Sequence, residues 1–148
     1  MEILETGEKL PGEEYDYREV CFGIVERDGK FLVVFSSKDR NVSLPGGGIE
    51  KGETPVQAIY REFLEEAGYR VKSAEEVVRV HSYWNFQTGK RVERFAYIFA
   101  VEVEEESKTT PIENWHTRLW VETTDANNVI PFPYQKAGIE YYLSKFKR

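Results

Sequence analysis

Hydrophobic positions in the first third of the chain predict short strands. Apolar runs at 20–25, 31–35 and 42–44 are rich in Val and Phe, which is typical of buried strands. Asp28 and Gly29 separate the first two runs and favour a tight turn. We therefore expect these two runs to pair as a hairpin.

Longer apolar segments follow in the second half. Residues 71–83 and 92–103 predict two strands on either side of a turn at 87–90. In the second of them hydrophobic residues occupy consecutive positions, so both faces are expected to be buried. A short strand is predicted at 119–121. The polar residues before Arg18 either add an edge strand or stay irregular.

A helix is predicted directly after the glycine run at 46–48. Thr54 is a suitable N-cap, Pro55 suits the first helical position, and Gln57 completes a capping box. Gly68 is placed to end the helix in a left-handed conformation. The apolar residues repeat at helical spacing and predict a buried stripe of Val56, Ile59, Tyr60, Phe63 and Ala67.

A final helix is predicted at 134–146, after Pro131 and Pro133. Its apolar stripe consists of Ala137, Ile139, Tyr142, Leu143 and Phe146. Together the elements predict an α/β protein in which a mixed sheet has a helix on each side. No repeat, linker or low-complexity tract divides the sequence, so we expect one domain over 1–148.

Composition adds limits to this picture. With 148 residues, 41% hydrophobic and 14% aromatic, the chain can bury a sizeable core. Its net charge of -6 gives no basic patch for long nucleic acid, so small anionic ligands would have to be met by a metal and by local Arg or Lys. The single cysteine, Cys21, lies in an apolar run and is expected to be a buried, non-catalytic thiol. Neither a signal peptide nor a membrane-spanning run is evident, so a cytoplasmic protein is expected.

Three glutamates on the predicted helix indicate chemistry. Glu62, Glu65 and Glu66 have the i, i+3 and i+4 spacing that places side chains on one face, where like charges repel. Carboxylates at this spacing suit a divalent cation such as Mg²⁺ or Mn²⁺. The glycine run permits close approach of the backbone, so a carbonyl of Gly46 or Gly47 can join them.

The same stretch resembles the signature of the Nudix hydrolase family, G-x5-E-x7-R-E-U-x-E-E-x-G-U, in which U is a bulky apolar residue. Every fixed position matches. The two U positions carry aromatic residues instead of the usual aliphatic ones. The matching residues are Gly47, Glu53, Arg61, Glu62, Phe63, Glu65, Glu66, Gly68 and Tyr69.

The resemblance implies an α/β/α sandwich and an Mg²⁺-dependent hydrolase, with Mn²⁺ as a substitute. Its substrate would be a nucleoside diphosphate linked to another group. Glu62, Glu65 and Glu66 match the family's metal-binding glutamates, while Glu53 and Arg61 match the pair that ties the loop to the helix. The signature leaves open the general base, the number of metal ions, the substrate and the oligomeric state.

Other candidates lie outside the signature. Glu113 is placed where the family often has a further acidic residue, and it is as readily an ordinary loop glutamate. Tyr134 and Gln135, with Phe132 beside them, lie where MutT-type members of the family place groups that contact the base. The acidic run 104–106 is expected to be a solvated face. Neither lone histidine has metal-ligand spacing to another histidine, so both are expected to be structural or exposed: His81 and His116.

Two alternatives to a hydrolase remain. The domain could sense a nucleotide without turnover, in which case it would bind nucleotide tightly and release no product. It could also use the glutamates only as a structural cation site. Within the hydrolase hypothesis, MutT-type triphosphates, dinucleoside polyphosphates and ADP-sugars are all open as substrates.

Overall fold

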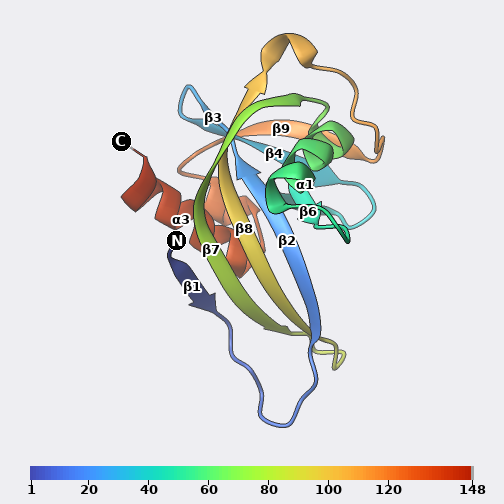
Figure 1. The fold of residues 1–148 in the computed structure, drawn as a ribbon, viewed down its shortest axis with the longest axis vertical. Coiled ribbons are helices and arrows are strands. Elements are labelled where there is room, and N and C mark those ends of the chain that lie inside the picture. The colour runs from blue at the N-terminus through green and yellow to red at the C-terminus, as the bar shows by residue number, and fades with distance from the viewer. Residues whose placement is uncertain (148) are drawn as a thin grey trace.

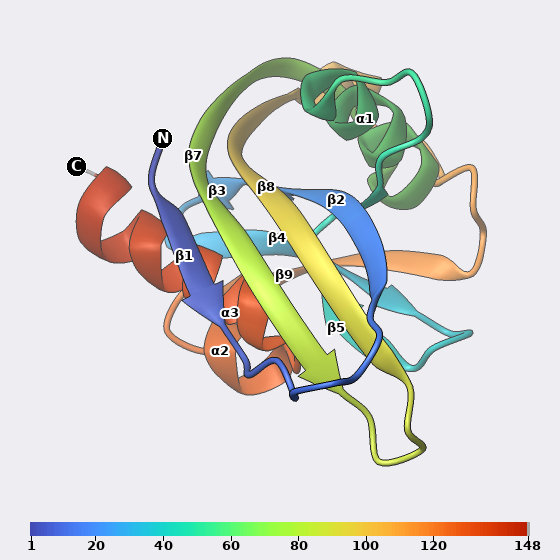
Figure 2. The same ribbon diagram turned by 60° about the horizontal axis from the view of Figure 1, so that its bottom comes forward.

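The computed structural model describes residues 1–147, so Arg148, the last residue of the predicted domain, lies outside the described part. The strands of the larger sheet lie in the order β1 (Ile3–Thr6), β7 (Arg70–Asn85), β8 (Arg91–Glu104), β2 (Asp16–Ile24) and β6 (Gly46–Gly48). This sheet is mixed: β1 is parallel to β7 and β2 is parallel to β8, whereas the β7–β8 and β2–β6 pairs are antiparallel. The N-terminal residues thus add the edge strand that was one of two expectations, as Figure 2 shows along β7.

A smaller sheet contains β3 (Glu26–Arg27), β4 (Lys30–Ser36), β5 (Asn41–Ser43) and β9 (His116–Glu122). The predicted hairpin between 20–25 and 31–35 is wrong for most of its length. The pairing is limited to β3 and Val25 against the start of β4, across a turn in which Asp28 and Gly29 both have positive φ. The run at 20–25 pairs instead with β8, because the chain changes sheets after Ile24. Local turn chemistry was visible in the sequence, but this change of partner was not.

The helix after the glycine run begins as predicted. Thr54 and Gln57 form the capping box, and Gly68 ends the helix with φ 72°. The regular helix α1 (Pro55–Glu62) is continued by a π-helical turn, η1 (Phe63–Ala67). The remaining helical elements are η2 (Glu105–Ser107), α2 (Ala126–Val129), α3 (Pro133–Tyr141) and η3 (Tyr142–Phe146).

The helices α1 and α3 cover opposite faces of the larger sheet (Figure 1). On one face Ile59 and Phe63 pack against β2 and β8, and on the other Tyr134 and Ile139 do so. This is the predicted α/β/α sandwich. Three predicted stripe positions are wrong, because the sheet covers a narrower face of each helix than the apolar stripe: Val56, Tyr60 and Leu143 are exposed.

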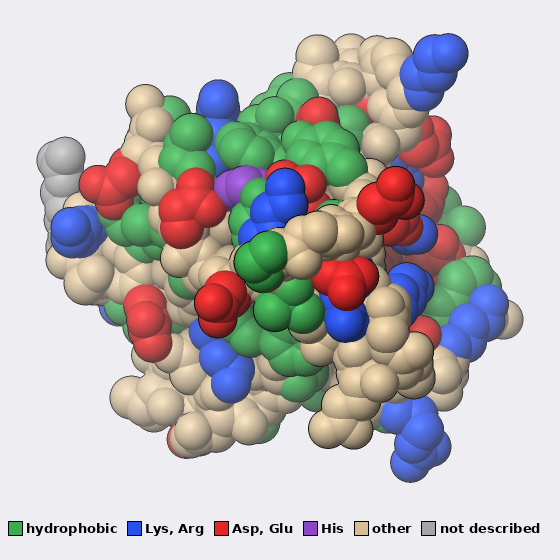
Figure 3. Space-filling view, turned by 90° about the horizontal axis from the view of Figure 1, so that it is seen from below, with side chains coloured by type: hydrophobic (Ala, Val, Ile, Leu, Met, Phe, Trp, Pro, Cys, Tyr) green, Lys and Arg blue, Asp and Glu red, His purple; other side chains and the backbone are tan. Residues whose placement is uncertain are grey.

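The surface seen from below groups hydrophobic side chains near its middle, with acidic and basic side chains mixed around them (Figure 3). No helix within residues 1–147 is long and apolar enough to cross a membrane. The cytoplasmic location itself stays a prediction.

Candidate active site

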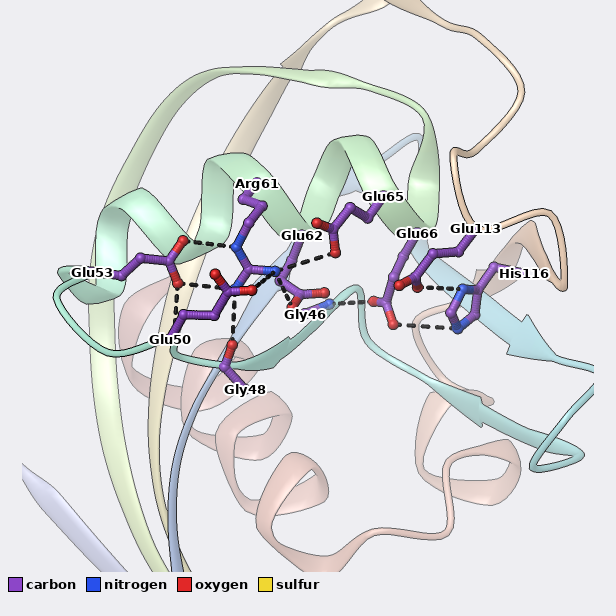
Figure 4. A network of polar contacts seen from close by, with 10 residues as sticks. All are labelled: Gly46, Gly48, Glu50, Glu53, Arg61, Glu62, Glu65, Glu66, Glu113 and His116. Atoms are coloured by element: carbon purple, nitrogen blue, oxygen red, sulfur yellow. Dashed lines mark hydrogen bonds and ion pairs between the residues drawn. The ribbon is translucent and has the colours of Figure 1, made fainter.

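Arg61 on α1 holds the loop that precedes the helix. Its Nε lies 2.7 Å from Glu53 Oε2, and its Nη2 donates to Glu53 Oε1 and to the Gly48 carbonyl, each at 2.9 Å (Figure 4). The hydrogen bond from Arg61 lowers the pKa of Glu53 below its ordinary value. A forked guanidinium suits this two-point contact with a carboxylate, so the loop end and the helix are joined rigidly.

The remaining guanidinium nitrogen of Arg61 faces two of the signature glutamates. Nη1 donates to Glu62 Oε1 at 2.8 Å and to Glu65 Oε2 at 3.2 Å. One arginine therefore contacts Glu53, Glu62 and Glu65 together, and these contacts raise its pKa. In this arrangement Arg61 balances part of the negative charge on the helix face.

The negative charge of Glu66 is not balanced by Arg61 in this way. Its side chain is 14% exposed, and Oε1 accepts a hydrogen bond from the Gly46 amide at 2.7 Å. Burial raises the pKa of Glu66 to about 9; the Gly46 bond opposes this, while Glu62 and Glu113 add to it. Burial likewise raises the pKa of Glu62, whose side chain is 10% exposed, to about 7, although Arg61 opposes the shift. Two neighbouring acids are thus held where their charged forms are unfavourable.

The loop before β9 and the first residue of that strand bring two further groups to the helix. The Glu113 amide donates to the Glu65 carbonyl at 2.9 Å, which ties this loop to η1. Nδ1 of His116 lies 3.1 Å from Glu113 Oε1, and Nε2 lies 3.3 Å from Glu66 Oε2. Glu66, Glu113 and His116 offer ligand atoms within 4.8 Å of one another.

His116 differs from its sequence expectation. Its side chain is only 9% exposed, and it faces two carboxylates across a site instead of lying alone. Burial lowers the pKa of His116, which favours the neutral imidazole that can bind a metal. Histidine–histidine spacing could not identify His116 as a site residue, because its neighbours in the site are glutamates. The Glu113-x-x-His116 spacing was the signal available in the sequence.

Gly47 fits the site because it has no side chain. A Cβ there would lie 2.8 Å from Glu62 Oε1, closer than real contacts allow. Gly47 is opposite Cys21 in the β2–β6 pair. Cys21 is fully buried, and burial raises its pKa to about 12, so its thiol is not a nucleophile.

A pocket of about 520 Å³ extends from this cluster across the smaller sheet. Glu66 and His116 line it beside the acidic cluster, and Phe132 and Tyr134 line it where it adjoins a smaller pocket that Glu66 and His116 do not border. Gln135 also borders the pocket, but its side chain is 1% exposed and its amide is engaged by the protein. Its Oε1 accepts from the Leu44 amide at 2.8 Å, and its Nε2 donates to Ser43 Oγ and the Tyr134 hydroxyl.

The donor set fits a divalent cation. Two carboxylates and one imidazole, those of Glu66, Glu113 and His116, converge within 4.8 Å. The two other predicted metal-binding glutamates, Glu62 and Glu65, lie on the same helix and pair with Arg61. Among residues 1–147, Arg61 is the only arginine or lysine that forms an ion pair with a signature glutamate. Carboxylate oxygens suit Mg²⁺ or Mn²⁺. The arrangement can therefore hold a cation beside a pocket of nucleotide size.

A model of the NUDIX domain matches residues 17–142. The chain belongs to the Nudix family. Nudix hydrolase 13, mitochondrial, of Arabidopsis thaliana is 29% identical over 140 residues, which are 88% of this chain and 66% of that protein. An RNA pyrophosphohydrolase of Aeromonas hydrophila is 32% identical over 72 residues, 49% of this chain and 41% of that protein. The chain thus spans less than two thirds of the length of these curated relatives.

Solved Nudix structures share the fold. The MutT protein of Bacillus halodurans has a TM-score of 0.71 and 21% identity, and the match covers 88% of this chain and 84% of that one. A NUDIX hydrolase from Nitrosomonas europaea has a TM-score of 0.65 and 23% identity, over 89% and 92% of the two chains. At this level of identity the likeness concerns the fold alone.

Proposed function

We propose that this Nudix protein hydrolyses a phosphoric anhydride bond in a nucleoside diphosphate linked to a second group, with Mg²⁺ as its cation and Mn²⁺ as a substitute. The observation that carries the proposal is the buried pair Glu62 and Glu66. Their raised pKa values mean that two anions at this place need positive charge. Arg61 meets only Glu62 of the two, and the pocket opens beside Glu66.

Glu62, Glu65 and Glu66 would hold the cation, with Glu113 and the carbonyl of Gly47 as further oxygen donors. His116 offers a nitrogen at the same place. When bound, the cation would neutralise charge on the phosphate oxygens and lower the pKa of water. Metal sites that keep water on the ion need few fixed protein ligands, so these groups need not all bind at once.

The protein's own residues would have three tasks in this reaction. Arg61 keeps Glu62 and Glu65 in place through the contacts described above. A carboxylate at this place can take a proton from water, which Glu62 or Glu66 would do at a side-chain oxygen. Nε2 of His116, 3.3 Å from Glu66 Oε2, would orient that carboxylate.

The other end of the pocket supports a nucleotide as the ligand. Phe132 and Tyr134 offer flat aromatic surfaces on which a base can stack. Protein groups already take up the hydrogen-bonding atoms of the Gln135 side-chain amide. We therefore infer that Gln135 holds β5 and α3 together. It would lie beside the base without a free polar atom to contact it. MutT-type triphosphates, dinucleoside polyphosphates and nucleotide sugars such as ADP-sugars all present this combination of base and anhydride.

The test is a hydrolysis panel with purified protein and Mg²⁺. It contains nucleoside di- and triphosphates, dinucleoside polyphosphates and nucleotide sugars. It also contains 5′-triphosphorylated RNA, because one of the relatives is an RNA pyrophosphohydrolase. Chromatography of products identifies the substrate, and reaction in ¹⁸O-labelled water identifies the phosphorus attacked. No product from any compound would refute the proposal. Tight nucleotide binding without product would favour the sensing alternative.

A further inference from the structure

A narrow pocket of about 200 Å³ adjoins the larger one and is lined mainly by rings. Trp84 and Phe86 come from the end of β7 and the turn after it, with ring centroids 5.9 Å apart. Phe132 and Tyr134 come from the start of α3, 6.0 Å apart. We call this pocket the aromatic slot. One ligand can reach from Glu66 into the slot, because the slot shares five lining residues with the larger pocket: Asn41, Phe86, Arg94, Phe132 and Tyr134.

Arg94 on β8 lines both the aromatic slot and the larger pocket. Its side chain is partly buried, and the guanidinium lies 5.2 Å from the centroid of the Tyr134 ring. Within residues 1–147 no carboxylate or carbonyl accepts a hydrogen bond from it, whereas Arg61 and Arg79 both contact glutamates. The cation–π contact with Tyr134 restricts where the guanidinium can lie, and among the described residues its N–H donors have no protein acceptor.

Building on the proposed function, we propose that Arg94 determines specificity by reading the O6 and N7 acceptors of a 6-oxopurine base held in the aromatic slot. The rings stack with any base and do not discriminate. Two parallel donors of arginine match the two acceptors on this edge of guanine, and hypoxanthine presents the same edge. Adenine presents an amino donor in place of O6, which would face another donor.

Charge near the slot is consistent with this assignment. The larger pocket also holds Asp39, and Glu66 lies at its opposite end, so Arg94 is the positive group among these pocket-lining residues. A phosphate drawn to Arg94 would have to share the slot with four aromatic rings, which suit a base better. The phosphates are thus expected at the Glu66 end and the base at the Arg94 end.

The test is calorimetric binding of GMP, IMP and AMP in the presence of Mg²⁺ to the full chain. We expect GMP and IMP to bind about tenfold or more tighter than AMP. Arg94→Met keeps a long stem against Tyr134 but removes the donors. In this variant the affinities for GMP and IMP should fall to that for AMP, while the affinity for AMP changes little. An unchanged melting temperature shows that the variant folds.

Arg94→Lys is the matched second variant, because it keeps the charge and loses the fork. The preference for GMP and IMP over AMP should also be lost in this protein. Tightest binding of AMP by the unaltered chain would overturn the proposal, as would a preference that survives in both variants. Equal weakening of all three nucleotides and of pyrophosphate would assign Arg94 to phosphate and overturn it too. This outcome is independent of the hydrolysis panel, because a preference for one base in binding does not require hydrolysis.

Discussion

The backbone amide of Gly46 donates a hydrogen bond to Oε1 of Glu66 across 2.7 Å. This contact joins β6 to the π-helical turn η1 and fixes one carboxylate oxygen. The other oxygen, Oε2, lies 3.3 Å from Nε2 of His116, and both residues line the pocket. π-Helical turns are frequent at functional sites because the extra residue in the turn changes where side chains point. The position of Glu66 is therefore set by the backbone on two sides.

Replacement of this carboxylate should separate activity from folding. Gln at position 66 still accepts the Gly46 bond but carries no charge. We expect Glu66→Gln to lower kcat/KM about a hundredfold or more and to leave the metal-free melting temperature unchanged or higher. Glu106→Gln, on the exposed acidic run, is the matched control and should have full activity. A purely structural cation site would show the opposite, a loss of stability in Mg²⁺ with no activity to lose.

Two neighbouring glycines provide a paired steric test. A methyl group on Gly47 would meet Glu62 Oε1 at 2.8 Å, whereas one on Gly48 would meet open space. Gly47→Ala should push Glu62 aside and weaken Mn²⁺ binding about tenfold, and Gly48→Ala should leave it unchanged. Titration of Mn²⁺ by electron paramagnetic resonance measures both. Equal affinities would show that Glu62 is not needed for the metal.

The metal-free protein should lose stability as pH rises. Glu62 and Glu66 have folded pKa values of about 7 and about 9, above the ordinary value of 4.5. Between the ordinary and the folded values the folded state binds more protons than the unfolded state, so raising the pH favours unfolding. In EDTA we expect a lower melting temperature at about pH 8 than at about pH 5.5. Mg²⁺ or Glu66→Gln should reduce this difference, and a slope unchanged by both would contradict the assignment.

Arg61 should not be replaceable by lysine. Its guanidinium contacts Glu53, Glu62, Glu65 and the Gly48 carbonyl together, and one ammonium cannot reproduce that geometry. We expect Arg61→Lys to lower kcat/KM and Mn²⁺ affinity by about tenfold or more. The control is Arg70→Lys, in an exposed pair with Glu104, which should change neither. Retention of both quantities in Arg61→Lys would show that the fork is dispensable.

The sequence predicted most accurately where local chemistry decides structure. The capping box of Thr54 and Gln57 and the left-handed Gly68 both lie where the pattern placed them, because their interactions span a few residues. The burial of Phe63 and Tyr69 also follows from the signature, in which aromatic residues fill the two apolar positions. The exposure of Tyr60 was not predictable, since it depends on how far the sheet extends beneath α1.

The rest of the site depends on tertiary contacts between residues far apart in the sequence. Glu113 and His116 are about 50 residues beyond Glu66 in sequence, and only the packing of their loop on η1 brings them to it. Arg94 gave no sequence signal, because its place beside Tyr134 results from the pairing of β8 and the docking of α3. The predicted hairpin was wrong for the same kind of reason, as strand partners are chosen across the whole sheet.

By itself the sequence determined the helix that carries the glutamates, its beginning and end, and the family to which the chain belongs, because caps, periodicity and a fixed motif act over short distances. Tertiary structure alone decided which carboxylates are buried, that His116 joins them, and that Arg94 lines an aromatic pocket. Burial and partner choice depend on residues far apart in the chain, and they set the pKa values and the ligand geometry on which function depends.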